Sequence, residues 1–196
     1  FFVAVLLIEL TPGPNMGYLA ALSASQGRAA GFKAVLGVTV GLAFYMLLAV
    51  LGVAEIVAAA PFVFHALRWA GVLYVLFLAW EAWRGASETS PGHARDMDHA
   101  PFWRGLIANV LNPKALVFYV ALLPSFIAVD HAPVWAQALL LGSLHLAVSF
   151  IVHSMIVLGA SHVGGAIVRS QNAVTLRRAL AISIVLIAAW LAWETR

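Results

Sequence analysis

Two short stretches, Thr11-Pro12-Gly13-Pro14-Asn15 and Asn112-Pro113-Lys114, interrupt hydrophobic segments that are each long enough to cross a lipid bilayer. Proline lacks a backbone N–H and clashes with the carbonyl four residues earlier, so each stretch is expected to break a helix. Lipid cannot satisfy the freed backbone groups, so a break at membrane depth must face protein or a water-filled cavity. One break early in each half of the chain is typical of transporters built from two related repeats.

The composition indicates a membrane protein. Of the 196 residues, 63% are hydrophobic and only 10% are charged, and the mean hydropathy is +0.97. Soluble domains average about 45–50% apolar and about 25% charged residues. A span needs about 20 apolar residues, and the chain carries no Asp, Glu, Lys or Arg between Lys33 and Glu55. We therefore expect an all-α integral membrane protein.

Breaks, prolines and charges together predict six transmembrane helices, of which the first and the fourth are broken by proline. A polar connector divides the chain into two sets of three helices, and an odd number of crossings makes the second set inverted relative to the first. The predicted organisation is one transmembrane domain made of a first repeat (1–84), a connector (85–101) and a second repeat (102–196). The expected helices span residues 2–23, 34–57, 63–83, 105–129, 133–160 and 177–193.

The basic residues predict the orientation of this domain. Nine of the eleven fall on one side of the predicted topology, which the positive-inside rule assigns to the cytoplasm. The connector is then cytoplasmic, both termini face outward, and the positive charge faces anionic lipid instead of nucleic acid. The chain opens inside a hydrophobic run, so we expect a short native start to be missing and this run to be the first span. The nine residues are Arg28, Lys33, Arg84, Arg95, Arg104, Lys114, Arg169, Arg177 and Arg178.

An ordered set of motifs along nearly the whole chain resembles the LysE/RhtB family of lysine exporters and homoserine/threonine efflux proteins. The resemblance implies export of small amino acids or their derivatives across the bacterial cytoplasmic membrane, driven by proton or ion exchange, and it leaves the cargo open. The matching residues are Thr11-Pro12-Gly13-Pro14-Asn15, Gly37, Gly41, Ala70-Gly71, Tyr74, Leu78, Trp80, Phe102, Gly105, Asn109, Asn112-Pro113-Lys114-Ala115, Phe118, Pro124 and Phe126.

The breaks themselves predict a substrate site. Carbonyls released by the prolines, those of Ile8, Leu10 and Asn109, are suited to an ammonium group, and N–H groups of the half-helix beginning near Asn15 are suited to a carboxylate. The alternative is that the prolines only kink helices for packing and that Thr and Asn side chains cap them. The candidate substrate-binding residues are Thr11, Pro12, Gly13, Pro14, Asn15, Asn109, Asn112, Pro113 and Lys114. For Lys114 the alternative is a positive-inside anchor that reaches the headgroups.

Three residues are candidates for proton coupling. Glu9 lies inside the first span, where a charged carboxylate costs about 2.5–3.5 kcal/mol, so it should be neutral, paired or turned toward a cavity. Its alternative is simple contact with interfacial water. His145 and His153 share one face of the fifth helix with Ser149, since their spacing is four residues. They can relay protons, bind a divalent cation, or act as polar contacts between helices.

Two rival functions follow from those histidines. One is a divalent-cation exporter, and the other is a membrane-embedded enzyme. No convergent set of nucleophile, base and metal ligands is apparent, so we predict no catalytic residue, no metal site and no cofactor. The chain has no cysteine, which excludes disulfides and thiolate metal sites. The GxxxG spacings Gly13/Gly17 and Gly37/Gly41 are expected to serve packing within the chain first and a homo-oligomer face second.

Overall fold

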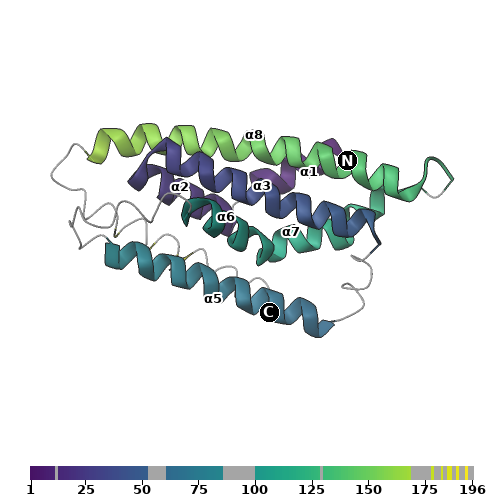
Figure 1. Cartoon of the computed structure of the whole chain (residues 1–196), viewed down its shortest axis with the longest axis horizontal. Coiled ribbons are helices and arrows are strands. Elements are labelled where there is room, and N and C mark those ends of the chain that lie inside the picture. Colours follow the sequence, from purple (N-terminus) through teal and green to yellow (C-terminus); the bar gives the residue numbers. More distant parts are fainter. Residues whose placement is uncertain are drawn as a thin grey trace.

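The computed structural model describes residues 1–11, 13–52, 61–85, 100–128 and 130–168, together with isolated positions between 178 and 193. Over these residues the chain is helical and contains no strand (Figure 1). The predicted connector between positions 86 and 99 and the sixth helix, 177–193, lie outside the continuously described residues, so the two inverted three-helix repeats stay a prediction. The all-α class is confirmed for the part of the chain that is described.

Both proline breaks are present. Helix α1 (Phe2–Leu10) is followed by α2 (Pro14–Gln26) at an angle of 56°, and α6 (Ala100–Val110) is followed at 51° by a second segment that starts at Pro113. That segment consists of α7 (Pro113–Val117), the π-helical turn η2 (Phe118–Leu122) and the 3₁₀ turn η3 (Pro124–Phe126). The helix after each break, α2 or α7, starts on a proline. Proline is favoured at the first helical position because its missing N–H needs no partner there.

The unbroken helices are longer than, or shifted from, the predicted ones. Helix α3 (Arg28–Val50) begins six residues before the expected start, because Gly27 adopts φ 84° and reverses the chain in a single residue. Arg28 and Lys33 therefore lie within α3 and not in a loop between helices. Helix α5 (Pro61–Gly85) starts directly at Pro61, and α8 (Val134–Val168) continues past the expected end at residue 160.

Among the described residues, two helical stretches, Arg28–Val50 and Val134–His162, are long and apolar enough to cross a membrane by themselves. The number rises to four if each bent pair counts as one span. Large apolar side chains cover much of the outside, including Phe62, Leu140 and Met155. An apolar exterior of this kind is suited to lipid and not to water.

Helix α3 packs mainly against α6 and α8, and it lies between α8 and α5 in the view of Figure 1. The α3–α6 contact is backbone on backbone. A Cβ atom on Gly37 would overlap the carbonyl oxygen of Phe102, and one on Gly105 would overlap the carbonyl oxygen of Ala34. A Cβ on Gly41 would press on the Asn109 side chain. Packing within the chain, the first use predicted for Gly37 and Gly41, is confirmed.

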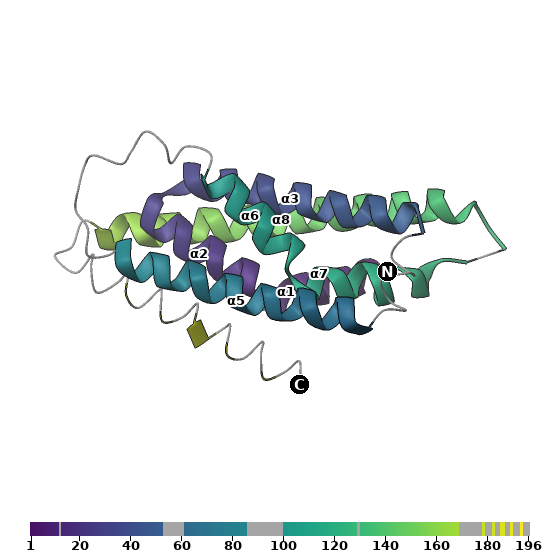
Figure 2. The ribbon, with the colours of Figure 1, turned by 60° about the horizontal axis from the view of Figure 1, so that its bottom comes forward.

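Helix α8 lies along one edge of the bundle in Figure 1 and α5 along the opposite edge. The broken pair α1–α2 lies in the region between them in both views (Figures 1 and 2), and α6–α7 lies there in Figure 1. An apolar cluster formed by α1, α3, α7, η2 and α8 surrounds the region of the breaks and includes Val5, Leu42 and Leu116. Gly13 and Pro14 of the first break and Asn112 and Pro113 of the second are buried within the protein, whereas Thr11 is exposed.

Candidate functional site

The two breaks meet through side chains that are far apart in sequence. The Asn15 amide nitrogen, in the first turn of α2, donates to Oδ1 of Asn109 in α6 at 2.8 Å. The Lys114 ammonium, in the first turn of α7, donates to the carbonyl oxygen of Thr11, also at 2.8 Å. Each bond therefore ties one interruption to the other.

Carbonyls that were expected to be free are occupied. The N–H of Thr11 reaches the Ile8 carbonyl at 3.3 Å, and the N–H of Asn112 reaches the Asn109 carbonyl at 3.0 Å. The Asn112 bond joins residues three apart and forms a 3₁₀-type turn before Pro113, whereas the Thr11 N–H is shared between Ile8 and, at 3.0 Å, the Leu7 carbonyl. The expectation that the backbone of Ile8 and Asn109 is released to a substrate is wrong for this conformation.

One freed carbonyl is satisfied from another helix. Lys114 N–H, which would continue the helix to Val110, instead donates to Oδ1 of Asn112 at 3.0 Å. The carbonyl of Val110 accepts the hydroxyl of Tyr45 from α3 at 2.5 Å. Side-chain capping, the alternative that the sequence left open, therefore holds at the second break.

The two half-helix starts differ. Asn112 caps α7 with its own side chain, whereas the N-cap of α2 is Gly13, which has no side chain to offer. A helix N-terminus carries a partial positive charge and free N–H groups, so the start of α2 remains suited to an anion. The Lys114 side chain adds positive charge beside it, because its Nζ would lie 3.8 Å from a Cβ placed on Gly13.

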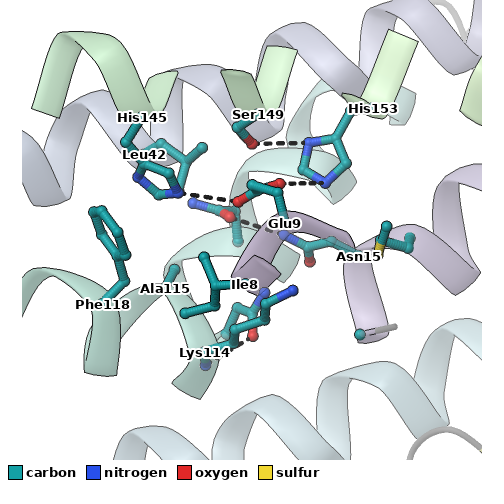
Figure 3. Close-up of a pocket in the computed structure, with 14 residues that line it drawn as sticks. Ile8, Glu9, Asn15, Leu42, Lys114, Ala115, Phe118, His145, Ser149 and His153 are labelled. Atoms are coloured by element: carbon teal, nitrogen blue, oxygen red, sulfur yellow. Dashed lines mark hydrogen bonds and ion pairs between the residues drawn. The ribbon is translucent and has the colours of Figure 1, made fainter. Parts of the chain in front are cut away.

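A buried carboxylate lies next to this junction. Glu9, at the end of α1, is only 6% exposed, and its two oxygens face two histidines of α8 (Figure 3). Oε1 is 3.0 Å from Nε2 of His145, and Oε2 is 3.8 Å from Nε2 of His153. The first separation is a hydrogen bond, and the second is an electrostatic contact that is too long for one. A carboxylate this deep in an apolar bundle requires such partners.

Hydroxyl groups hold the far nitrogen of each imidazole. Nδ1 of His145 lies 3.1 Å from the hydroxyl of Tyr119, and Nδ1 of His153 lies 3.1 Å from Oγ of Ser149. With Nε2 of His145 protonated and donating to Glu9, Nδ1 of His145 accepts a hydrogen bond from the Tyr119 hydroxyl group. Glu9 thus lies between two histidines that are each paired with a hydroxyl group, and it is hydrogen-bonded to His145 and in electrostatic contact with His153.

Tyr119 and Tyr45 were not identified from the sequence. Tyr119 lies in η2, where the i to i+5 bond from Leu123 N–H to the Phe118 carbonyl sets the turn. Phe118 stacks on His145 with ring centroids 3.7 Å apart. The signal that was available is general, since a tyrosine hydroxyl inside a span must find a partner. The partner that Tyr119 reaches depends on the π-helical turn η2, and no pattern in the sequence predicts that turn.

Lys114 lies at the junction of the two breaks. Its ammonium donates to the Thr11 carbonyl, and its side chain lines the cavity between the breaks. Pro113 starts a new segment at 51° to α6, and Lys114, in the first turn of that segment, reaches the first break. The substrate-binding role of Lys114 and the alternative of a positive-inside anchor both stay predictions.

A cavity of about 20 Å³ lies at the junction, enough for about one water molecule. Its wall combines a polar part and an apolar part. The polar part comprises Glu9, Asn15, Asn109, Asn112, Lys114, His145, Ser149 and His153, and the remainder comprises Ile8, Gly13, Met16, Leu42, Ala115 and Phe118. Of the candidate residues named from the sequence, Pro12 lies outside the described residues, and the others lie at the junction or in the turns that form it.

In the part of the chain that the structure describes, no group of three His, Cys, Asp or Glu side chains is arranged to hold a metal ion. Glu9, His145 and His153 converge, but both ring nitrogens of His145 face hydrogen-bonding partners within the protein. The arrangement is that of a buried carboxylate between two histidines, beside a polar cavity.

Comparison with known proteins gives the family. The sequence profile of the LysE type translocator family matches residues 6–195. An uncharacterized membrane protein of Pseudomonas aeruginosa is 34% identical over 139 residues, which is 67% of this chain and 64% of that protein, so the match spans less than two thirds of its length.

Two further relatives match over more of their length. The leucine efflux protein of Salmonella typhimurium is 33% identical over 167 residues, 83% of this chain and 78% of the relative. The leucine efflux protein of Enterobacter sp. strain 638 is 30% identical over 166 residues, 83% of this chain and 79% of the relative. No solved structure matches the chain. The chain belongs to the LysE type translocator family, and its members are transporters and not enzymes.

Proposed function

We propose that this protein exports an amino acid with an apolar side chain from the bacterial cytoplasm in exchange for a proton held at Glu9. The observation that carries the proposal is the position of Glu9, a buried carboxylate bonded to His145 beside a cavity where both helix breaks meet. The leucine efflux relatives support an amino acid as cargo. The proton-coupling residues are Glu9, His145 and His153.

The cavity wall supports a bipolar substrate. Positive groups, the Lys114 ammonium and the start of α2, lie on one side, and the carboxylate of Glu9 lies on the other. Leu42, Met16 and Phe118 supply an apolar part of the wall that suits an aliphatic side chain. An amino acid presents all three features in one small molecule.

Coupling to a proton follows from charge. Glu9 facing two imidazoles can release its proton when the positive charge of a substrate ammonium group enters the cavity, and it can bind a proton again when the ammonium leaves. Binding of the proton at Glu9 and binding of the substrate in the cavity would then oppose each other, so neither crosses freely. Substrate would leave the cell as protons enter.

The size of the cavity supports alternating access. The cavity is smaller than an amino acid, and a substrate would enter when the segments around the breaks move apart. We place this motion between two inverted repeats in the cytoplasmic membrane, with the connector inside and both termini outside, as the positive-inside rule requires. A homo-oligomer would leave the cavity within each chain.

The divalent-cation alternative has less support. His145 uses one nitrogen for Glu9 and the other for Tyr119, so neither is directed at a shared point where an ion would lie. The experiment below nevertheless includes metals, because a carboxylate between two histidines is a familiar ligand combination.

The test is counterflow in proteoliposomes made with the purified chain. Vesicles loaded with unlabelled leucine should accumulate labelled leucine from outside, and an imposed pH gradient should drive net uptake that a protonophore abolishes. Protein-free vesicles are the control. Failure to take up any labelled member of an amino-acid panel, together with uptake of Zn²⁺ or Mn²⁺, would overturn the proposal in favour of cation export.

A further inference from the structure

Two hydrogen bonds close the breaks against each other, and each joins a donor on one break to an acceptor on the other. Asn15, of the first break, donates to Asn109 near the second. Lys114, of the second break, donates to the Thr11 carbonyl of the first. When the breaks separate, each therefore keeps one donor and one acceptor.

Further capacity is buried at the same place. Oδ1 of Asn15 and Nδ2 of Asn109 have no hydrogen-bond partner within the described part of the protein, although the two residues are only 4% and 1% exposed. An unpaired buried polar atom is costly, and the exceptions call for an explanation. Both residues line the cavity, and the Asn109 amide packs so closely on Gly41 that a Cβ there would lie 2.8 Å from Nδ2.

The local fields match the donors and acceptors. Asn15 lies at the start of α2, where partial positive charge favours a carboxylate, and the Lys114 ammonium adds a full positive charge nearby. Thr11 directly follows α1, and the end of a helix favours a cation. The Lys114 ammonium already occupies that cationic position on the Thr11 carbonyl.

We infer that an α-amino-acid headgroup replaces these two bonds when it binds. Its carboxylate accepts hydrogen bonds from Nζ of Lys114 and Nδ2 of Asn15, and its ammonium donates to the Thr11 carbonyl and Oδ1 of Asn109. In the absence of substrate, the Lys114 ammonium thus occupies the position on the Thr11 carbonyl that the substrate's ammonium takes. This inference rests on the proposed export of an amino acid and assigns the atoms that recognise it.

The assignment predicts selectivity for both charged groups at once. A molecule that lacks the carboxylate cannot draw Lys114 away from Thr11, and one that lacks the ammonium leaves the Thr11 carbonyl without a donor once Lys114 has moved. Each loss removes hydrogen bonds to a charged group, so each should weaken binding at least about tenfold. The side-chain part of the cavity is the same for all such analogues.

The experiment pairs one deleted protein group with one deleted substrate group. Unlabelled leucine, L-leucinamide and 4-methylpentanoate compete against labelled leucine in counterflow, and half-inhibitory concentrations are compared in wild type, Lys114→Gln and Lys114→Arg. Leucinamide keeps the ammonium but has no carboxylate, and 4-methylpentanoate has the reverse. Lys33→Gln, which removes a cation from α3 outside the cavity, is the matched control.

In wild type both analogues should inhibit at least about tenfold more weakly than leucine. Lys114→Gln should weaken leucine and 4-methylpentanoate about tenfold and leave leucinamide within about twofold, and Lys114→Arg should restore part of the loss. Equal weakening of all three compounds would overturn this inference while leaving the exporter standing. Absence of leucine counterflow in wild type would overturn the proposed function as well.

Discussion

Oε1 of Glu9 lies 3.0 Å from Nε2 of His145, although the two residues are 136 positions apart in the chain. The contact joins the end of the first half-helix to the middle of α8, and both side chains are almost completely buried. A carboxylate in this position costs free energy wherever it has no partner. The pair is therefore expected to serve both proton coupling and stability, and separate measurements can distinguish the two roles.

Glu9→Gln should separate coupling from transport. The amide has nearly the shape of the carboxylic acid and can still hydrogen-bond to His145, but it cannot gain or lose a proton. We expect leucine counterflow, which needs no net proton movement, to continue at a reduced rate, while uptake driven by a pH gradient falls to the level of protein-free vesicles. Labelled leucine flux with and without the gradient measures both.

Asp130→Asn provides the control for this variant, because it removes an exposed carboxylate in the turn before α8. It should keep the response to the gradient. Gradient-driven uptake in Glu9→Gln equal to that of wild type would remove Glu9 from the coupling step, whatever happens to the rate of counterflow.

The stability of the Glu9–His145 pair can be measured with a double-mutant cycle. His145→Leu leaves the buried carboxylate without its hydrogen-bonded partner, so the free energy of unfolding should fall by about 3 kcal/mol or more. Adding Glu9→Leu removes the stranded charge and should recover a good part of that loss. Thermal unfolding in detergent provides the comparison.

His131→Leu, at an exposed position outside the bundle, should change stability by no more than about 0.5 kcal/mol. If the losses of the two single variants simply added up in the double variant, Glu9 and His145 would not stabilise the fold as a pair.

Much of the fold could be predicted because the causes are local. Proline cannot continue a helix, and the actual breaks fall at Pro14 and Pro113, where the chain has no alternative. The start of α3 was predicted too late because a charged first turn looks like a loop. One glycine with positive φ, Gly27, is sufficient to turn the chain and start the helix at Arg28.

The site was predictable in its members but not in its bonds. Glu9, His145 and His153 stand out because ionisable residues inside spans are expensive. Which backbone groups stay free depends on neighbours that are distant in sequence, and the second break is capped by Tyr45, 65 positions away from Val110. The bond from Lys114 to the Thr11 carbonyl could not be predicted for the same reason, since it depends on the angle between α6 and the segment that starts at Pro113.

Gly37→Ala should disrupt the closest helix contact. The added methyl group would overlap the carbonyl oxygen of Phe102 and lie 2.8 Å from the Leu106 nitrogen, and both are backbone atoms that can move only if α3 and α6 separate. Overpacking of this kind typically costs about 1–3 kcal/mol.

Gly159→Ala in α8 is the matched control, because a Cβ there meets nothing within 4 Å. It should be neutral or stabilising, by up to about 1 kcal/mol, from helix propensity. Equal melting temperatures for the two variants would contradict direct backbone packing between α3 and α6.

Tyr45→Phe tests how the second break is satisfied. The variant keeps the ring that stacks on Tyr119 at a centroid distance of 6.0 Å and removes only the hydroxyl that donates to the Val110 carbonyl. That carbonyl has lost its helical donor, since the Lys114 N–H is bonded to Asn112. We expect the free energy of unfolding to fall by about 1–3 kcal/mol, the cost of leaving a buried acceptor unpaired.

Thr39→Val is the matched control on the same helix, because the Thr39 hydroxyl donates to the Val35 carbonyl, which also accepts a backbone N–H within α3. Thermal unfolding of both variants in detergent decides the point, since a Tyr45→Phe protein as stable as Thr39→Val would mean that the break does not depend on α3 for its hydrogen bond.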